Sequence, residues 1–499
     1  MSGRGGKRDG NLCHVKECLP PAQRGSDKAG TAKRGHMASK GTKAADDAWV
    51  ERLAVLILVL ALLYAIVGIP SLDRDAAVAT DYVNPLNRWV WLGLLAMSMP
   101  ILSQRWREVA SLAMHSWALL LLFGYFALST TWALDPDTSV RRLIFSLVQL
   151  VLFIIVLSGM RRPPLLHVVI AGVCVVIATL DLASWVVMPG YAMTSDGFAG
   201  LQLQKNQTGL LMMYGCLSAG CGVFLLQRRL HRWALAGAVV MMAALLVATR
   251  STTSQSIIIM APIVVPVILL IARLPNPVIY ATVATGLLVL ATAAFGYLAW
   301  CGATGTDPML PLRGVTFTGR TDLWSFVSGE IAKRPWFGAG YSSFWAINPA
   351  VQPSLKTDQW FGVYVIINEA HEGYLDLLAT GGVVGLAGGL FVLFRTIGMA
   401  FRAITRTEPA ARAWQDGTLA YPTAVFHLAL LLGLVVHNFT ESNLFSNNSV
   451  LAVAFLLCAL DLERWRIGAR RAAAARVRPI MRAAPAAGAA GASRQWSSG

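Results

Sequence analysis

Long runs of apolar residues, separated by short polar segments, make up most of this 499-residue chain. Each run is roughly 20 residues long, the length that an α-helix needs to cross a hydrocarbon core of about 30 Å. The sequence lacks the alternation in ten-residue units that is typical of membrane β-barrels. The pattern therefore predicts an all-α polytopic membrane protein with about twelve transmembrane helices. The predicted helices are 52–70, 88–103, 111–130, 141–159, 165–188, 206–226, 232–249, 254–273, 277–300, 372–394, 421–437 and 448–463.

Composition excludes a soluble globular domain, because 56% of the residues are hydrophobic and only 14% are charged. If the basic N-terminal segment is cytoplasmic, most arginines between the predicted helices also face the cytoplasm, as the positive-inside rule requires. Both termini are then cytoplasmic. The net charge of +16 is explained by anionic lipid headgroups as partners, without nucleic acid. The arginines of the predicted inner loops are Arg105, Arg107, Arg161, Arg162, Arg228, Arg229, Arg232, Arg273, Arg395, Arg402, Arg406 and Arg412.

The two ends of the chain, residues 1–47 and 466–499, lack apolar runs and are expected to be disordered cytoplasmic tails. The first is no cleavable signal, because the first hydrophobic run begins only after Trp49. Met37 is an alternative start to Met1. The seven cysteines form no CxxC pair, so neither a disulfide framework nor a zinc site is expected.

One long polar interruption, residues 301–370, separates helices one to nine (48–300) from helices ten to twelve (371–465). The predicted orientation makes it a large periplasmic loop. Glycines, arginines and aromatic residues are concentrated in it, and the same orientation puts Arg250 and Lys205 on the same face of the membrane. We therefore expect the functional site at the outer face.

Two arginines are the candidates for binding an anion. Arg320 precedes an amphipathic stretch, 323–331, which is expected to form a short helix lying on the membrane. Alternatively, Thr321 or Asp322 caps that helix and Arg320 is a solvated flank. Arg250 ends a predicted span beside several hydroxyl residues, so it either snorkels to headgroups or binds an anion. The planar fork of arginine suits a phosphate group.

His371 opens the helix that follows the loop. The N-terminus of a helix disfavours the protonated imidazole, so His371 is predicted to be neutral and able to accept a proton, although a structural histidine fits the same position. Glu441, between the last two predicted helices, is a second candidate base or an orienter for an arginine, and a helix-turn role fits it as well. Lys205 either snorkels to the interface or contacts a phosphate.

Residues 335–341 predict a tight, glycine-assisted turn with aromatic anchors, for which a structural role is favoured over a catalytic one. Trp336 and Tyr341 are nevertheless candidate substrate-binding residues, and Trp336 would suit the lining of a sugar channel. Asp135 and Asp137 resemble a DxD metal motif, but an N-cap before a helix explains them more simply. No metal and no cofactor are therefore predicted.

The order of these motifs carries a family resemblance. An arginine follows the seventh predicted helix, a Gly-Arg sequence and a Pro-Trp-Phe-Gly-Ala-Gly-Tyr turn lie in the outer loop, and a histidine opens a glycine-rich helix. This order resembles the O-antigen ligase / O-antigen polymerase superfamily. The segments 128–132, 205–209 and 439–442 are most similar to the branch of exopolysaccharide polymerases.

The resemblance implies a GT-C-like, metal-independent glycosyltransferase in the inner membrane. It would transfer a glycan from an undecaprenyl-diphosphate carrier to a lipid-linked acceptor at the periplasmic face. Its expected partners are this carrier-linked glycan, membrane lipids and other polysaccharide-assembly proteins. Arg250 and Arg320 would hold the diphosphate and stabilise it as leaving group. His371 would orient or deprotonate the acceptor hydroxyl. Many relatives have asparagine at the position of Glu372 and histidine at that of Gln204, and the first difference bears on acceptor selection.

Two other functions stay open. An O-antigen ligase would differ only in its acceptor, a sugar of the lipid A core. A small-anion transporter would predict internal repeats and charged or broken helices near the bilayer midplane. The midplane stretches of this sequence are mostly apolar, which favours the glycosyltransferase.

Overall fold

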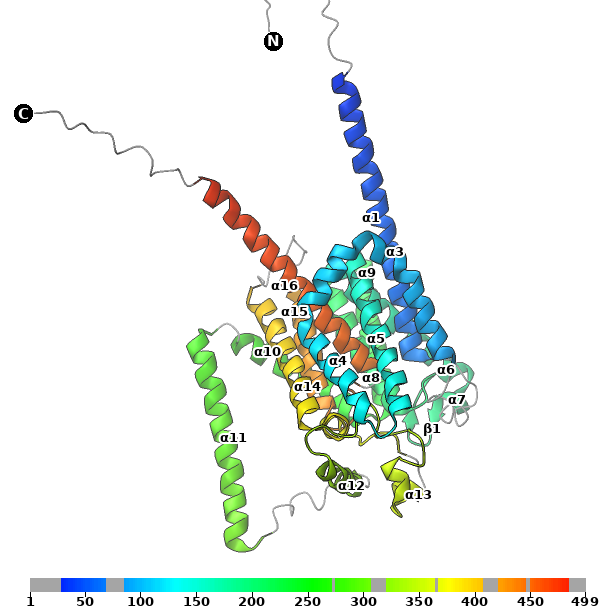
Figure 1. Ribbon diagram of the computed structural model, residues 1–499, viewed down its shortest axis with the longest axis vertical. Helices are drawn as coiled ribbons and strands as arrows, with labels where there is room; N and C mark the ends of the chain where they lie inside the picture. The colour runs from blue at the N-terminus through cyan, green and yellow to red at the C-terminus, as the bar shows by residue number, and fades with distance from the viewer. Residues whose placement is uncertain are drawn as a thin grey trace, which may run out of the picture. The chain divides into compact units, whose positions relative to one another are not determined.

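The computed structural model describes residues 28–68, 85–271, 274–306, 320–363, 367–406, 421–445 and 449–483. The chain divides into two compact units, Met1–Trp49 and Val50–Gly499. In the first unit, the described residues form the beginning of helix α1 (Lys28–Val67). The second unit contains the other described elements (Figure 1).

The second unit is built almost entirely from helices. The long helices after α1 are α3 (Pro85–His115), α4 (Trp117–Ser129), α5 (Pro136–Gly159), α6 (Pro163–Val187), α8 (Lys205–Leu225), α9 (Arg229–Thr249), α10 (Thr252–Ile271), α11 (Asn276–Thr304), α14 (Gly373–Arg406), α15 (Tyr421–His437) and α16 (Val450–Ala483). The shorter elements are η2 (Thr130–Trp132), α7 (Pro189–Ala192), α12 (Arg320–Lys333), η4 (Pro353–Lys356), α13 (Trp360–Val363) and the antiparallel strands β1 (Met193–Thr194) and β2 (Gly197–Phe198).

Each apolar run predicted from the sequence overlaps one of these helices. Among the described residues, seven helices are long and apolar enough to cross a membrane, or eight if the bent pair α3–α4 counts as one span. Helix α15 is apolar but only 17 residues long. The all-α polytopic architecture is therefore confirmed, whereas the figure of about twelve spans stays a prediction.

Helices α3 and α4 correct one predicted boundary. The sequence predicts an inner loop between 103 and 111, but α3 continues as a helix to His115, with a kink at Arg105 where φ is −121° and ψ is 24°. The chain then bends by 73° into α4. The hydroxyl of Ser116 donates to the carbonyl of Leu112 at 2.9 Å at this bend. Arg105 and Arg107 thus lie in a helix and not in the expected loop. Arginine has a good helix propensity, so a polar segment that contains it need not interrupt the helix.

The expected tails also differ in part from the prediction. Residues 28–47 are helical and continue into the apolar part of α1. At the other end, α16 continues to Ala483, well beyond its apolar part. Alanine and arginine favour helix, which explains an extension that the apolar pattern does not signal. Residues 1–27 and 484–499 lie outside the described residues.

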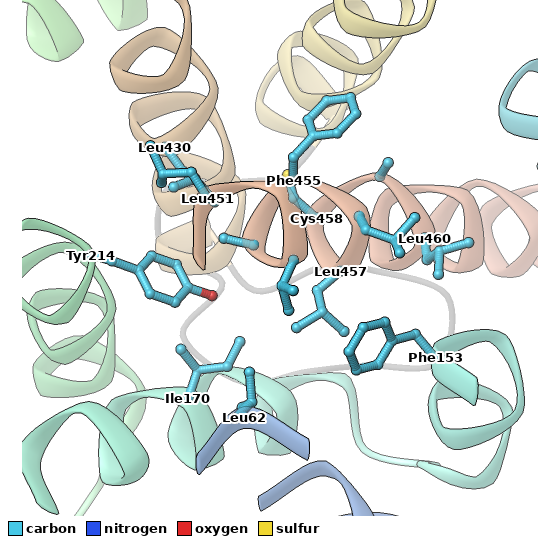
Figure 2. Packing of buried hydrophobic residues seen from close by; sticks show 14 of the residues in the cluster. Leu62, Phe153, Ile170, Tyr214, Leu430, Leu451, Phe455, Leu457, Cys458 and Leu460 are labelled. Carbon is cyan, nitrogen blue, oxygen red and sulfur yellow. The ribbon is translucent and has the colours of Figure 1, made fainter. Parts of the chain in front are cut away.

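Helix α16 lies in the middle of the main hydrophobic cluster, which Figure 2 shows from close by. Leu451 and Phe455 of α16 are fully buried, as is Tyr214 of α8. Helix packing in lipid relies on close van der Waals contact. Glycine supplies this closeness where α8 meets its neighbours, since a Cβ on Gly215 would lie 2.5 Å from the sulfur of Met242.

The later part of α16 carries buried charged residues that pair with one another and with α14. Asp461 and Glu463 are each 1% exposed. Arg464 Nη2 lies 2.6 Å from Asp461 Oδ1, and Arg466 Nη2 lies 2.7 Å from Glu463 Oε2. Arg395 of α14 also pairs with Glu463. A buried carboxylate needs such partners because the interior solvates charge poorly.

The turn at 335–340 is docked onto a break in α14. At Gly382, φ is 62° and ψ is −168°, so the helix opens locally. The N–H of Val383 then donates to the carbonyl of Pro335 at 2.9 Å, and the N–H of Ala339 donates to the carbonyl of Ala379 at 2.8 Å. The loop is thereby fixed to the bundle through backbone hydrogen bonds.

Gly382→Ala should destabilise the protein, because a Cβ there would lie 2.3 Å from the backbone of Trp336 and the left-handed φ is strained for alanine. We expect a loss on the order of 1–3 kcal/mol, measured by thermal unfolding in detergent. Gly398→Ala is the matched control, since it lies in the same helix and its Cβ would meet nothing within 4 Å. Equal unfolding temperatures for the two variants would contradict the docking role.

Candidate functional site

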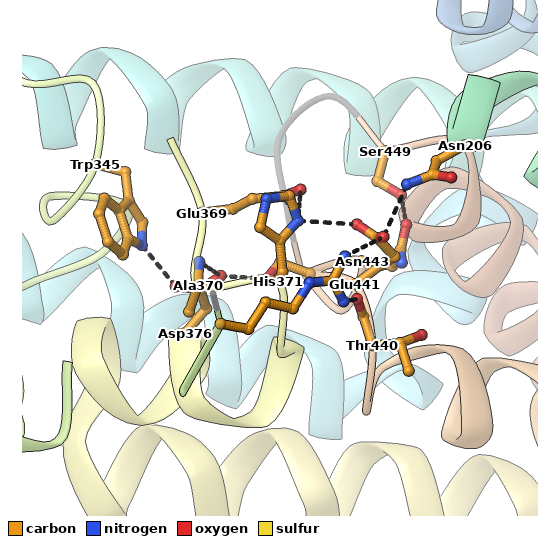
Figure 3. Close-up of polar contacts among 12 residues, drawn as sticks. Asn206, Trp345, Glu369, Ala370, His371, Asp376, Thr440, Glu441, Asn443 and Ser449 are labelled. Carbon is orange, nitrogen blue, oxygen red and sulfur yellow. Dashed lines mark hydrogen bonds and ion pairs between the residues drawn. The ribbon is translucent and has the colours of Figure 1, made fainter. Parts of the chain in front are cut away.

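Three residues from distant parts of the chain meet at Glu441, in the turn between α15 and α16 (Figure 3). Arg320 Nη2, at the start of α12, lies 3.2 Å from Glu441 Oε1. His371 Nδ1, just before α14, lies 3.2 Å from Glu441 Oε2. Asn206 Nδ2, in the first turn of α8, donates to Glu441 Oε1 at 3.0 Å. We call these four residues the Glu441 cluster.

Glu441 is held as a carboxylate. Its side chain is 15% exposed, and burial acts to raise its pKa. The hydrogen bond from His371, its charge and the charge of Arg320 outweigh burial, so the pKa of Glu441 lies below its usual value. The carboxylate therefore organises two cations at neutral pH.

His371 is protonated, which corrects the neutral imidazole expected from its place near a helix start. Its Nδ1 lies between Glu441 and Glu369, whose Oε1 is 2.9 Å away. Burial acts to lower the pKa of His371, but the two carboxylates raise it to about 9. Two negative charges within about 4 Å raise the pKa more than the N-terminus of α14 lowers it. This helix also begins only at Gly373, two residues after His371. The residue itself adopts a left-handed backbone, with φ at 51°.

Arg320 is aimed at the bundle and is not a solvated flank. Its Nη1 donates to the carbonyl of Thr440 at 2.6 Å, beside its pairing with Glu441. The helix α12 begins at Arg320 itself. Leu323 and Val327 of α12 are fully buried in a small hydrophobic cluster with Phe361. The expected membrane-surface face of this helix is therefore a protein-packing face.

Arg250 precedes a segment that contacts the turn carrying Glu441. It ends α9 in a left-handed conformation, with φ at 55°, and its side chain is exposed. No part of the chain that the structure describes forms a hydrogen bond or ion pair with its guanidinium. Three residues later, Thr253 Oγ1 lies 2.9 Å from Thr440 Oγ1, next to the carbonyl that Arg320 binds. The guanidinium of Arg250 is thus exposed, and binding of an anion there stays a prediction.

The other predicted substrate-binding residues fall in different places. Lys205 Nζ donates to the carbonyl of Asp196 at 3.2 Å, one residue before Asn206. Trp336 is 64% exposed on the docked turn. Tyr341 is only 4% exposed, and its hydroxyl lies 2.9 Å from Ser146 Oγ. Its ring packs 4.6 Å from that of Phe126. The structure therefore gives Tyr341 a packing role in place of the expected contact with substrate.

Asp376 is a site residue that the sequence analysis missed. Its Oδ1 accepts from Trp345 Nε1 at 2.6 Å, and its Oδ2 accepts from the N–H of Ala370 at 2.9 Å. The hydroxyl of Ser442 also donates to Oδ2. Ala370 precedes His371 and Ser442 follows Glu441, so one buried carboxylate fixes the neighbours of both. An acidic residue in the first turn of a helix was the available signal.

Asn438 and Glu369 were missed as well. The carbonyl of Asn438 accepts from the N–H of Gly373 at 2.7 Å, which ties the end of α15 to the start of α14. Its Oδ1 accepts from the N–H groups of Asn443 and Leu444, each at 3.1 Å, and shapes the turn that carries Glu441. The contact of Asn438 with Gly373 joins distant parts of the chain and leaves no sequence pattern, whereas Glu369 lies only two residues before its partner His371.

Possible metal ligands gather here too. Potential ligand atoms of Glu369, His371 and Glu441 lie within 4.8 Å of one another. Arg320 already neutralises Glu441, and the shared Nδ1 of His371 would have to lose its proton before it could bind a metal. These two charges oppose a cation. Asp135 acts as the N-cap of α5, accepting from the N–H of Thr138 at 3.0 Å, as the capping interpretation predicts.

A comparison with known families adds to this geometry. Residues 197–390 match the family model described as O-antigen ligase. This segment is thus similar to the O-antigen ligase family. The resemblance to the O-antigen ligase and polymerase superfamily is thereby confirmed. No curated protein matches the chain.

The family match covers less than half of the chain but most of the site. Arg250, Arg320 and His371 lie inside it, together with Asn206. Glu441 lies outside it, on a turn that only the fold brings to the other three. The match supports a membrane enzyme in the assembly of O-antigen and related polysaccharides.

Asp376→Ala should destabilise the site, because the Trp345 indole, the Ala370 N–H and the Ser442 hydroxyl would lose a buried acceptor. We expect a loss of at least about 2 kcal/mol in thermal unfolding. Asp137→Ala, in the first turn of α5 and exposed, is the matched control and should cost less than about 0.5 kcal/mol. Similar unfolding of both variants would refute the role of Asp376.

Proposed function

We propose that this protein is a polysaccharide polymerase of the O-antigen and exopolysaccharide type. It would extend a glycan with units carried on undecaprenyl diphosphate, at the periplasmic face of the inner membrane. The observation that supports this most is the Glu441 cluster, in which an arginine and a protonated histidine lie beside a carboxylate. Most of its members lie in the segment that matches the O-antigen ligase family.

Arg320 and Arg250 would bind the diphosphate of the donor. Arg320 is partly open to solvent, with 22% of its side chain exposed, and Arg250 is exposed and free of described partners. A guanidinium stays charged at any relevant pH and binds two phosphate oxygens at once. Both charges would stabilise the diphosphate as it leaves.

The transfer step needs one proton acceptor. The oxygen of the acceptor hydroxyl forms a bond to the anomeric carbon, while the bond between that carbon and the diphosphate oxygen breaks. The diphosphate leaves with the electron pair, and the hydroxyl proton goes to a carboxylate. We assign this proton to Glu441, because His371 already holds one at neutral pH.

His371 then orients Glu441 and adds positive charge at the diphosphate. Its Nδ1 is shared by Glu369 and Glu441, and 28% of its side chain is exposed. An imidazolium donates two hydrogen bonds, so its other nitrogen is available to a phosphate oxygen or an acceptor hydroxyl. Trp336, exposed on the docked turn, would offer an apolar face to a sugar, and Lys205 a further charge.

Polymerase and ligase differ in the acceptor alone. The segments 205–209 and 439–442 favour the polymerase through their resemblance to exopolysaccharide polymerases. In the structure, Asn206 and Glu441 from these two segments are hydrogen-bonded to each other, which supports a joint role. Transport of a small anion is less well supported, because the buried carboxylates of α16 already have arginine partners.

Complementation of a deletion strain tests this function through Arg320. Arg320→Lys keeps the positive charge but loses the fork that reaches Thr440 and Glu441 together. We expect at least a tenfold loss of polymer, the effect of losing about 1.4 kcal/mol or more. The readout is the length distribution of surface and secreted polysaccharide on a gel.

Arg334→Lys is the matched control for Arg320→Lys, because Arg334 is exposed at the end of the same helix and should not affect polymer. Loss of long chains with single repeats retained supports a polymerase. Accumulation of carrier-linked chains without capped lipopolysaccharide supports the ligase alternative. Unchanged polysaccharide in the deletion strain excludes both.

The pH dependence of transfer tests the protonated state of His371. Its pKa of about 9 is above the ordinary 6.5, so the protonated form stabilises the cluster fully below about pH 6.5. This contribution is lost as the pH rises through about 9. We expect glycan transfer by membrane vesicles to fall between about pH 8 and about pH 10. In His371→Gln, transfer should be low and lack this step, whereas a rise of wild-type transfer with pH would point to neutral His371 as the base.

A further inference from the structure

A second polar cavity lies at the other end of the helix bundle from the Glu441 cluster. Helix α16 begins beside the cluster, where Ser449 Oγ donates to Asn443 Oδ1 at 2.6 Å. The cavity lies further along α16, at residues 461–471, where the last turn of α5 and the kinked part of α3 pack against it. Its volume is about 290 Å³.

Arginine dominates the lining of this cavity. Arg105 of α3, Arg161 after α5, and Arg464 and Arg471 of α16 all line it. The carboxylates in the lining are Glu108 and Asp461. The cavity thus collects guanidinium groups from three separate segments.

The two carboxylates do not balance these arginines equally. Asp461 is fully occupied, since its Oδ1 pairs with Arg464 at 2.6 Å and its Oδ2 binds His167 at 3.3 Å and His427 at 3.0 Å. Glu108 is 46% exposed and 3.8 Å from Arg105, which makes a weak pair. The lining of the cavity therefore contains more guanidinium groups than carboxylates.

Arg464 adds an unsatisfied donor at the same place. Its Nη1 donates to the carbonyls of Leu157 and Met160, at 2.9 and 3.0 Å. Its Nε is buried and has no hydrogen-bond partner among the described residues. A buried charged donor without an acceptor is costly, and an anion in the cavity would supply the acceptor.

Aromatic residues indicate that the cavity lies at the level of lipid headgroups. Trp465 lines it, and Trp106, next to Arg105, is 58% exposed. The guanidinium of Arg107 lies 5.4 Å from the centre of the Trp106 ring. Tryptophan and arginine together are typical of the membrane–water interface. The positive-inside pattern assigns this end of the bundle to the cytoplasm.

We propose that this cavity binds the phosphate group of an acidic membrane phospholipid. Arginines from α3, the α5–α6 connection and α16 would share its oxygens, while the acyl chains stay in the surrounding bilayer. Basic pockets between transmembrane helices on the cytoplasmic side suit such headgroups. The lipid would join three segments that meet at the kink of α3.

The test uses the purified, delipidated full-length protein in detergent. Native mass spectrometry would record bound lipid, and thermal unfolding would record stabilisation, after addition of phosphatidylglycerol, phosphatidylcholine or inorganic phosphate. We expect phosphatidylglycerol to be retained and to raise the unfolding temperature, and the other two to do neither. Equal stabilisation by inorganic phosphate would show that the cavity binds a free anion and not a lipid, and would overturn the proposal. A failure to retain phosphatidylglycerol would overturn it as well.

Variants locate the binding. Arg105→Gln combined with Arg471→Gln should weaken retention of phosphatidylglycerol by about tenfold or more. Arg471→Gln alone should show a smaller loss of phosphatidylglycerol retention. Because Arg471 is exposed, this single variant should fold normally and can be read even if the double variant misfolds. Arg229→Gln, an exposed arginine at the start of α9, is the matched control. Equal losses in the control would show general surface attraction and refute the cavity.

Discussion

The candidate site depends on the contacts of one carboxylate, Glu441. It joins the start of α12, the segment before α14 and the first turn of α8 through Arg320, His371 and Asn206. These partners are between 70 and 235 residues away in the chain. Without Glu441, two cations would face each other in a partly buried place and repel. The carboxylate therefore permits the concentration of positive charge that the proposed diphosphate donor would need.

The contact between Glu441 and His371 also affects which groups of the site carry a proton. Between Glu369 and Glu441, His371 keeps its proton at neutral pH, so it is a donor and a charge. A proton acceptor must then be a carboxylate. A diphosphate that binds Arg320 and His371 would compete with Glu441 for them, which would free the carboxylate for the acceptor hydroxyl at the moment when donor is bound.

A rigid support surrounds these charges. Asp376 holds the neighbours of His371 and Glu441, and the carbonyl of Asn438 ties α15 to α14. The break at Gly382 lets α14 accept the 335–340 turn through backbone hydrogen bonds. Catalytic groups positioned by buried hydrogen bonds on helix ends are held more precisely than groups on free loops. The described parts of the polar interruption, 320–363 and 367–370, are thus attached to the bundle and have a small core around Phe361.

The sequence by itself determined the all-α membrane architecture, because apolar runs of membrane length leave few other structures in a bilayer. It also singled out Arg320, His371, Arg250 and Glu441, since charged residues are rare in such a chain and stand out. It could not determine which of them touch, nor that Tyr341 is a core residue, because both depend on contacts between distant segments. The protonation of His371 was likewise decided by tertiary structure. A helix start is visible in the sequence, and Glu369 lies only two residues before His371, but Glu441 is 70 residues away and becomes a neighbour of the imidazole only in the fold.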